Sequence, residues 1–325
     1  MKPSILNVLV AATFSLSAPI AVAETTIKLG HVTQISHPFH IGAKMYQEEV
    51  RSRSDGDLNI KIYPARQLGD DKQLLEGVRL GTVDAAIVSS AVFAGFTPVM
   101  DALQLPFLIN TYDDLSEALT SSVAKDMLDS LETIGLKGLG YYEGGLRNLL
   151  VSEKPVTDLD GMKGLKIRVV PAPLHLDIWK AIGASPTPMA YGEIYTSLQT
   201  GVLDGAEINI SSVYSEKLYE VSNYIARSKH YFWPGVMVIN PRFFEQLSKE
   251  QQDILIKAAH DTIAPQIAKA EEQEARAEKA LLKEGMTILE IEDRGELRQA
   301  VQPVIEKYLD KHTLIQAFVK QVESQ

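Results

Sequence analysis

Apolar and polar side chains alternate along two early stretches of the chain. Residues 26–32 (TIKLGHV) and 58–63 (LNIKIY) show the period of two that predicts strands. Between them, apolar side chains recur at helical spacing from Phe39 to Val50, and Gly56 ends the pattern. The pattern predicts a strand, a helix and a second strand in that order.

The next stretch continues this alternation. Residues 70–81 (DDKQLLEGVRLG) begin with aspartates suited to a helix cap and place apolar side chains on one helix face before Gly81. Residues 82–90 (TVDAAIVSS) then predict a buried strand. Strands that alternate with helices are typical of a parallel sheet covered by helices, so we expect an α/β fold.

The second half of the chain repeats this plan. It predicts a strand at 165–170, helices at 173–183 and 191–201, and a strand at 202–209. The segments LGTVDAAIVSS and TGVLDGAEINI share a helix stop, a glycine and an aspartate, with Gly81 and Gly201 lying 120 positions apart. We therefore expect two lobes of the same architecture.

The last third predicts a returning strand and a long helix. The strand YFWPGVMVIN carries Pro234, which favours a sheet edge or a bend. Ser248 and Gln251 form a capping box that opens a helix reaching about Glu284, with a kink at Pro265. At about 1.5 Å per residue this helix would be about 55 Å long, enough to brace both lobes.

The expected domain boundaries follow from these elements. Lobe I is predicted to contain residues 24–146 and 234–275, and lobe II residues 147–233 and 276–325. A chain of 325 residues is long enough for two such domains, each with its own core.

The first 23 residues have the pattern of a secretory signal. Lys2 precedes an apolar stretch that ends in Ala21-Val22-Ala23, which predicts cleavage after Ala23. A membrane anchor is the alternative, although the apolar stretch is shorter than a bilayer span requires. The signal predicts export, and a periplasmic location in a bacterium.

Charge and cysteine content narrow the function classes. Without the signal, 31 Lys and Arg stand against 42 Asp and Glu, a formal charge of −11. Such an acidic surface argues against nucleic acid or anionic lipid as a partner. The chain has no cysteine, so it has no disulfide framework and no residue for an N-terminal lipid anchor.

Catalytic and cofactor motifs are absent from the sequence. It contains no nucleophile elbow, zinc-protease helix motif or phosphate-binding glycine loop, so we expect no cofactor and no enzyme activity. His31, His37 and His40 lie close in sequence and could ligate a metal. An exported metal-dependent hydrolase therefore remains an alternative.

Two arginines are placed to meet a ligand. Ligands of two-lobed α/β proteins bind outside the carboxyl ends of the strands, between the domains. The strand ends at Ser89, Arg168 and 207–209 therefore face one cleft, and Arg147 belongs to the crossover into the second lobe. Two guanidinium groups in a cleft suggest a carboxylate ligand, because each can donate two parallel hydrogen bonds. An Arg168 that faces solvent is the alternative.

Several segments together resemble the solute-binding proteins of tripartite ATP-independent periplasmic (TRAP) transporters. They include IYPARQLGDDKQLLEGVRLGTVDAAI, LRNLLVSEKPVTDLDGMKGLKIRV and GASPTPMAYGEIYTSLQTGVLDGAE, and they cover the chain after the signal in order. The resemblance implies a two-lobed periplasmic binding protein fold and a ligand bound between the lobes.

The resemblance also implies roles for individual residues. Arg168 corresponds to the family's carboxylate clamp, and Arg147 to a second arginine that assists it. Tyr191 corresponds to an aromatic residue packed on the ligand, His230 to a histidine that lines the cleft, and Ser89 to a position that contacts ligand in relatives.

Three further residues are candidates for ligand contact. The family's usual DGQEN reads DGAEI here, with Ile208 where a ligand-facing asparagine is common and Asn209 one place later. Asn209 either replaces that asparagine or caps the following helix. Glu207 lies at the same strand end, and Trp233 offers either a floor for a sugar ring or plain hydrophobic burial.

The predicted function is therefore capture of a small organic acid and its delivery to the membrane permease of a TRAP transporter, by a receptor that we expect to be a monomer. A sugar acid is favoured, because the expected site combines hydroxyl, amide and aromatic groups. C4-dicarboxylates, 2-oxo acids and aromatic acids remain open. A sensor of the same fold, which reports ligand to a signalling partner, is a further alternative.

Overall fold

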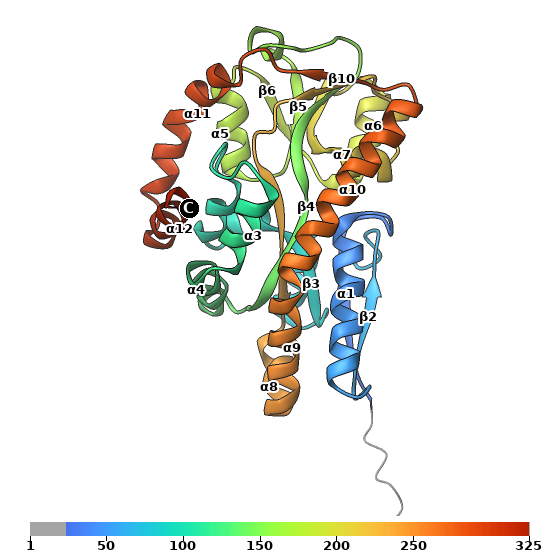
Figure 1. The fold of residues 1–325 in the computed structure, drawn as a ribbon, viewed down its shortest axis with the longest axis vertical. Helices are drawn as coiled ribbons and strands as arrows, with labels where there is room; N and C mark the ends of the chain where they lie inside the picture. The colour runs from blue at the N-terminus through green and yellow to red at the C-terminus, as the bar shows by residue number, and fades with distance from the viewer. Residues whose placement is uncertain (1–23, 325) are drawn as a thin grey trace, which may run out of the picture.

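The computed structural model describes residues 24–324 (Figure 1). The predicted signal at 1–23 and its cleavage after Ala23 lie outside the described residues. Within the described part of the chain, no helix has both the length and the apolar character needed to cross a membrane.

Ten strands form one continuous sheet that runs through the molecule. They are β1 (Thr25–Gly30), β2 (Leu58–Tyr63), β3 (Ala85–Ser89), β4 (Lys137–Val151), β5 (Lys166–Val169), β6 (Ser185–Pro188), β7 (Gly205–Asn209), β8 (Tyr224–Arg227), β9 (Phe232–Ile239) and β10 (Thr287–Glu290). The main order is β2-β1-β3-β9-β4-β7-β5-β6, while β8 pairs with both β4 and β10. The expected α/β architecture is confirmed.

The order of the strands shows two copies of one plan. In the first half β2, β1 and β3 are parallel and β9 runs antiparallel beside β3. In the second half β6, β5 and β7 are parallel and β4 runs antiparallel beside β7. The short sequence echo has the same structural role in both halves: Asp84 accepts a hydrogen bond from Lys28 N at 2.8 Å, and Asp204 accepts one from Lys166 N at 2.8 Å. The expectation of two similar lobes is therefore confirmed.

Strands β4 and β9 join the two halves, and of the two positions expected for Pro234 the sheet edge is wrong. Pro234 lies in β9, a central strand with β3 on one side and β4 on the other, and not in an edge strand. The pairing with β3 stops at Gly235, and the pairing with β4 shifts register between Glu143 and Leu146. Because Pro234 lies beyond one ladder and beside the irregularity of the other, its missing N–H costs no regular ladder bond. The alternative of a bend is the correct one.

Helices cover both faces of the sheet. The α-helices are α1 (Pro38–Arg53), α2 (Asp71–Leu80), α3 (Tyr112–Thr120), α4 (Ser122–Ser130), α5 (Pro173–Ala181), α6 (Ile194–Gln199), α7 (Ile210–Ser215), α8 (Pro241–Gln246), α9 (Lys249–Asp261), α10 (Ile263–Lys283), α11 (Arg294–Leu309) and α12 (Thr313–Glu323). The short 3-10 helices are η1 (Ser90–Gly95), η2 (Val99–Gln104), η3 (Leu131–Ile134), η4 (Asp160–Met162), η5 (Tyr191–Glu193) and η6 (Leu218–Glu220).

The expected long helix is present but bent into two segments. In Figure 1, α9 and α10 run diagonally from the first half of the molecule to the second. The break lies at Thr262, three residues before Pro265. A proline ring clashes with the carbonyl of the fourth residue before it, here Asp261, so the chain bends upstream of the proline itself. The Thr262 hydroxyl donates to Ala258 O at 2.8 Å and lies 2.9 Å from the hydroxyl of Tyr142, so side chains support the bend.

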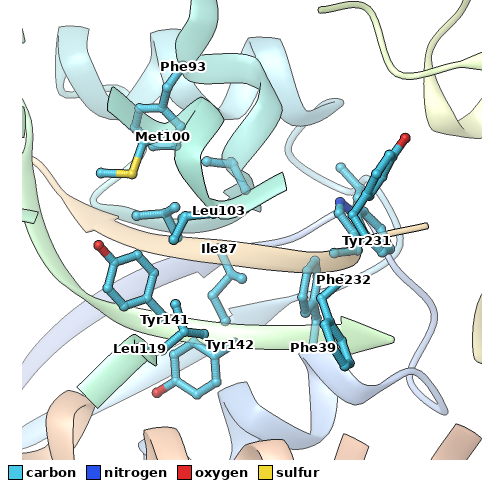
Figure 2. Close-up of a cluster of buried hydrophobic side chains, with 14 of the residues drawn as sticks. Phe39, Ile87, Phe93, Met100, Leu103, Leu119, Tyr141, Tyr142, Tyr231 and Phe232 are labelled. Carbon is cyan, nitrogen blue, oxygen red and sulfur yellow. The ribbon is translucent and has the colours of Figure 1, made fainter. Parts of the chain in front are cut away.

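The core lies around β4, β3 and β9, where the lobes join (Figure 2). Tyr141 and Tyr142 are adjacent on β4 and point to opposite faces of the sheet. Tyr141 donates to Ala124 O in α4 at 2.8 Å, whereas Tyr142 meets Thr262 at the bend. Each face of the central strand is thereby fastened to a different group of helices.

The C-terminal helices return along the molecule. Helix α11 packs on α5 of the second half, and α12 packs on α3, α4 and η2 of the first half. The C-terminal segment therefore contacts both halves, as does the α9–α10 pair (Figure 1).

Candidate functional site

A cavity of about 470 Å³ lies between the two halves of the sheet. Five of the residues predicted for the site line it: Ser89, Arg147, Arg168, Tyr191 and Trp233. The other three, Glu207, Asn209 and His230, are buried nearby and do not line it. Five of these eight residues thus form part of the cavity surface, and three lie behind it.

Arg147 is held by a carboxylate behind the cavity. It lies in β4 beside β7, paired directly with Asn209 across the ladder, and its side chain is fully buried. Its Nε donates to Glu207 Oε2 at 2.6 Å and Nη2 donates to Glu207 O at 2.9 Å. Its Nη1 has no hydrogen-bond partner among the described residues. One side of the guanidinium is therefore fixed, and an unpaired donor remains at the cavity.

Arg168 is the third of the four residues of β5, and only 2% of its surface is exposed. Its Nε donates to Met189 O at 3.0 Å, and its Nη1 lies 3.8 Å from Glu207 Oε1, too far for a hydrogen bond. This Nη1 also lacks a partner within residues 24–324. Burial lowers the pKa of Arg168 to about 10, against the opposing effect of Glu207, so the group stays protonated at neutral pH.

Glu207 holds the two arginines in place. Besides the bond from Arg147, Oε2 accepts from the hydroxyl of Tyr231 at 3.1 Å and Oε1 accepts from Val170 N at 3.2 Å. Burial is the largest single influence and opposes its ionisation, but the charge and hydrogen bond of Arg147, together with the nearby His175 and His230, outweigh burial and hold the pKa of Glu207 well below its usual range. Two guanidinium groups and one carboxylate leave one net positive charge, which matches one ligand carboxylate.

Aromatic rings form one wall of the cavity. Trp233 donates from Nε1 to Ser89 Oγ at 2.9 Å, and Tyr191 stacks on its ring with centroids 5.6 Å apart. The guanidinium of Arg147 lies 5.0 Å from the Trp233 ring. These contacts fix the indole, and flat apolar faces of this kind suit the C–H face of a sugar.

Two histidines lie behind the cavity, next to Glu207. His230 Nε2 is 3.9 Å from Glu207 Oε2 and makes no hydrogen bond in the described residues, while Nδ1 lies 2.7 Å from Ser228 Oγ. Burial lowers the pKa of His230 to about 4 despite the nearby carboxylate. His175, which the sequence reasoning missed, lies 3.7 Å from the other oxygen of Glu207.

Asn209 belongs to a separate polar cluster where β4 crosses between the halves. We call Glu143, Asn209, Gln266 and Glu274 the crossover cluster. Asn209 Nδ2 donates to Gly144 O at 2.7 Å, and Ser212 Oγ donates to Asn209 Oδ1 at 2.7 Å. Asn209 occupies the N-cap position of α7 without a capping hydrogen bond from its side chain.

The three histidines near the N-terminus have other partners. His31 Nε2 lies 3.1 Å from His40 Nδ1, and His31 Nδ1 lies 3.1 Å from the Thr33 hydroxyl. His37 caps α1 by accepting from Phe39 N and reaches Ser212 Oγ at 3.0 Å. Residues 24–324 contain no group of three potential metal-binding side chains.

An ion pair lies next to Tyr191, one of the residues that line the cavity. Arg66, which follows β2, donates from both terminal nitrogens to the carboxylate of Glu216, at 3.2 and 3.1 Å. Its guanidinium also lies 5.7 Å from the Tyr191 ring. Glu216 follows α7, so the pair links the first half of the molecule to the second.

The sequence reasoning missed one side of the cavity. Asp70, Asp71, Lys72 and Glu76, at the start of α2, also line it. The sequence pattern predicts caps for both aspartates. In the structure only Asp70 caps α2, accepting from Gln73 N at 3.0 Å, while Asp71 accepts from Ser89 N at 3.2 Å. No sequence signal predicts this contact, because it arises only when the end of β3 lies beside the start of α2.

Several known proteins are similar to this chain in sequence. Residues 29–312 match the family model described as bacterial extracellular solute-binding protein, family 7. The chain is 36% identical over 250 residues to the 2,3-diketo-L-gulonate-binding periplasmic protein YiaO of Escherichia coli K12, covering 77% of this chain and 75% of YiaO. It is 29% identical over 305 residues to the sialic acid-binding periplasmic protein SiaP of Vibrio cholerae, covering 93% and 94% of the two chains.

Solved structures with bound sugar acids have the same fold. The sugar acid binding protein DctPAm of Advenella mimigardefordensis, in complex with galactonate, gives a TM-score of 0.88 at 29% identity, covering 93% of this chain and 99% of that one. A TRAP periplasmic solute binding protein of Bradyrhizobium, in complex with galacturonate, gives a TM-score of 0.88 at 30% identity, covering 93% and 100%.

Proposed function

Because the chain belongs to the bacterial extracellular solute-binding protein family 7, the solute-binding proteins of TRAP transporters, we propose that it captures a sugar acid in the cavity between its lobes. The observation that carries the proposal is the pair of buried guanidinium nitrogens without a partner in the described residues, Arg147 Nη1 and Arg168 Nη1, on two side chains that line one cavity. An unpaired buried donor costs about 1 to 3 kcal/mol, and a ligand carboxylate would remove that cost twice.

In this proposal each lining residue has a role. Arg168 clamps the ligand carboxylate and Arg147 donates to its second oxygen. Tyr191 and Trp233 pack against the carbon chain or ring, and Ser89 hydrogen-bonds a hydroxyl. Glu207 and His230 act from behind the cavity by positioning Arg147, and Asn209 by fixing the crossover of β4.

The affinity expected for a sugar acid has several sources. A micromolar affinity corresponds to about −8 kcal/mol, and one bidentate ion pair in a protein supplies only part of it. Hydroxyl hydrogen bonds and exclusion of water by the closing lobes supply the rest. The overall charge of the protein is no obstacle, because the Debye length is about 8 Å at physiological salt and the ligand responds to the local arginines.

Members of this family are periplasmic components of transporters. For this chain we propose export by the signal at 1–23 with cleavage after Ala23. We further propose a monomer without catalytic activity, which hands its ligand to a TRAP membrane permease. The lobes that close on the ligand are residues 24–146 with 234–275, and 147–233 with 276–325, connected through β4, β9 and the bent α9–α10 helix.

A thermal-shift and calorimetric screen of organic acids tests the proposal. The panel contains galactonate, galacturonate, gluconate, succinate, pyruvate and benzoate. We expect at least one sugar acid to raise the melting temperature and to bind with a micromolar or lower Kd. Arg168→Ala should abolish the shift while the unliganded protein stays folded. Arg242→Ala removes an exposed arginine of α8 and serves as the control, with unchanged binding.

Two results would contradict the proposal. One is the absence of binding by every acid in the panel. The other is undiminished sugar acid binding by the folded Arg168→Ala variant, which would exclude the arginine clamp.

A further inference from the structure

One wall of the cavity is acidic, and it lies in the lobe opposite the arginines. Asp71 opens α2 and lines the cavity together with Arg147 and Arg168. Its neighbour Asp70 is occupied as the helix cap, in a capping box with Gln73. Asp71 is not needed for that cap, so its carboxylate is free for another role.

The position of Asp71 is fixed by the end of β3. Its Oδ1 accepts from Ser89 N at 3.2 Å, and no described residue donates to its Oδ2. Ser89 in turn receives the hydrogen bond from Trp233. The carboxylate is therefore attached to the wall of the cavity by one oxygen, and the second oxygen can accept hydrogen bonds from a ligand.

The charges around the cavity are unequally divided. The lobe II side has the net positive charge of Arg147, Arg168 and Glu207. The lobe I side has Asp70, Asp71 and Glu76 against Lys72 alone, and the Lys72 side chain is exposed. A ligand that spans the cavity meets a cationic end and an anionic end.

We propose that Asp71 is a specificity-determining residue that accepts hydrogen bonds from ligand hydroxyls and rejects a second ligand carboxylate. This inference rests on the proposed function and names its substrate class: a polyhydroxylated acid with one carboxylate at one end and hydroxyls at the other. A hydroxyl can donate to an anionic oxygen in a strong, charge-assisted hydrogen bond. A carboxylate cannot donate a hydrogen bond, and its negative charge would be repelled by the nearby carboxylate of Asp71.

The ionisation of Asp71 is consistent with this role. Burial raises the pKa of Asp71 to about 6, while the bond from Ser89 N and the charge of Arg168 oppose the rise. At pH 7 to 8 the side chain is therefore mostly a carboxylate.

Matched acids that differ only at the far end test the proposal. Galactonate and galactarate differ by a terminal hydroxymethyl against a carboxylate, as do gluconate and glucarate. Calorimetry on the wild-type protein should give a Kd for each monoacid at least about tenfold lower than for its diacid. In Asp71→Asn the monoacid should bind about tenfold more weakly, because the charge assistance is lost, while the diacid binds no more weakly than to wild type.

Controls separate this effect from a change in folding or in net charge. The asparagine of Asp71→Asn keeps an oxygen for Ser89 N, so the unliganded melting temperature should stay close to that of wild type. Asp113→Asn makes the same charge change in the exposed first turn of α3, away from the cavity, and should leave the monoacid-to-diacid ratio unchanged.

The outcomes distinguish this inference from the proposed function. A diacid that binds wild type as tightly as its monoacid, or an Asp71→Asn variant with an unchanged ratio, would overturn the role of Asp71 and leave the receptor function intact. An Asp113→Asn variant that changes the ratio as much as Asp71→Asn would also overturn it. Failure of wild type to bind any acid, mono or di, would overturn both proposals.

Discussion

Two buried polar clusters lie close together in the molecule and differ in whether their groups are ionised. The charge cluster, Arg147, Arg168 and Glu207, keeps its groups ionised and leaves two donors unpaired at the cavity. The crossover cluster, Glu143, Asn209, Gln266 and Glu274, contains no cation, and its carboxyl groups accept hydrogen bonds from backbone N–H groups.

The carboxyl groups of the two clusters show the difference most clearly. Arg147 holds the pKa of Glu207 well below its usual range although burial opposes this. Burial raises the pKa of Glu274 to about 7 and that of Glu143 well above its usual range. The carboxyl group that is paired with an arginine stays ionised and fixes that arginine, whereas Glu143 and Glu274 act as hydrogen-bond acceptors for the backbone.

Gln266 and Glu274 of the crossover cluster fasten helix α10 to the neighbouring backbone. Gln266 in α10 accepts from Glu143 N at 2.7 Å and donates to Glu143 O at 2.9 Å, which ties the helix to β4. Glu274, two turns further on, accepts from Ser211 N at 2.6 Å. Gly145 has a φ of +132°, and a Cβ there would collide with the Glu274 carboxylate, so only glycine fits this crossing. The crossover cluster thereby joins α10 to strands of both halves.

The largest expected effect concerns the pairing inside the charge cluster. Glu207→Gln leaves the guanidinium of Arg147 buried beside a neutral amide, and breaking a buried ion pair in this way costs about 3 to 5 kcal/mol. Urea unfolding at pH 7.5 should show this loss of stability. Glu216→Gln, in the partly exposed pair with Arg66, is the matched control and should cost less than about 1 kcal/mol. A similar loss in both variants would mean that the charge cluster is no different from a surface ion pair.

The second prediction separates the clusters by pH. The pKa of Glu274 is raised from 4.5 to about 7 in the folded protein, so the folded state binds the proton more tightly than the unfolded state does. The stabilisation from its protonated form is fully present below about pH 4.5 and is lost as pH rises to about 7, by up to about 3 kcal/mol.

Glu274→Gln measures this effect as a difference. The variant should be less sensitive to pH than wild type, so the difference in unfolding free energy between the two should change between pH 4.5 and 7 and be constant above about pH 8. Other titrating groups cancel in the subtraction. Parallel stability curves across the whole range would contradict the claim that the folded protein favours the protonated form of Glu274.

The smallest expected effect concerns the ion pair of Arg66 and Glu216. The Arg66–Glu216 pair links the lobes, but both side chains are partly exposed, so the pair contributes less than about 1 kcal/mol to closure. Arg66→Ala should therefore weaken sugar acid binding by no more than about fivefold in calorimetry. A loss of a hundredfold or more would indicate that the Arg66–Glu216 pair, and not the charge cluster, supplies most of the binding energy.

The sequence predicted the parts of the fold that depend on local periodicity. Strands β1, β2, β5 and β7 and helices α1, α2 and α5 lie where the apolar pattern places them, because each buries apolar side chains in the core. The glycine–aspartate echo predicted the two similar halves correctly, because Asp84 and Asp204 bind the same backbone position of a neighbouring strand.

Features that depend on distant neighbours could not be read from the pattern. The central position of Pro234 depends on a register shift between β4 and β9. In the site, the position of Arg168 on a strand and that of Arg147 in the crossover between the lobes were predictable. The inward orientation of Asp71 was not, because it requires the end of β3 to lie beside the start of α2.

A crystal structure of the protein with bound galactonate, or with the tightest sugar acid of the screen, tests the central claim most directly. The account predicts that the ligand carboxylate lies within 3.2 Å of both Arg147 Nη1 and Arg168 Nη1, distances typical of N–H···O hydrogen bonds. A carboxylate bound elsewhere, with both guanidinium nitrogens still unpaired, would contradict the account.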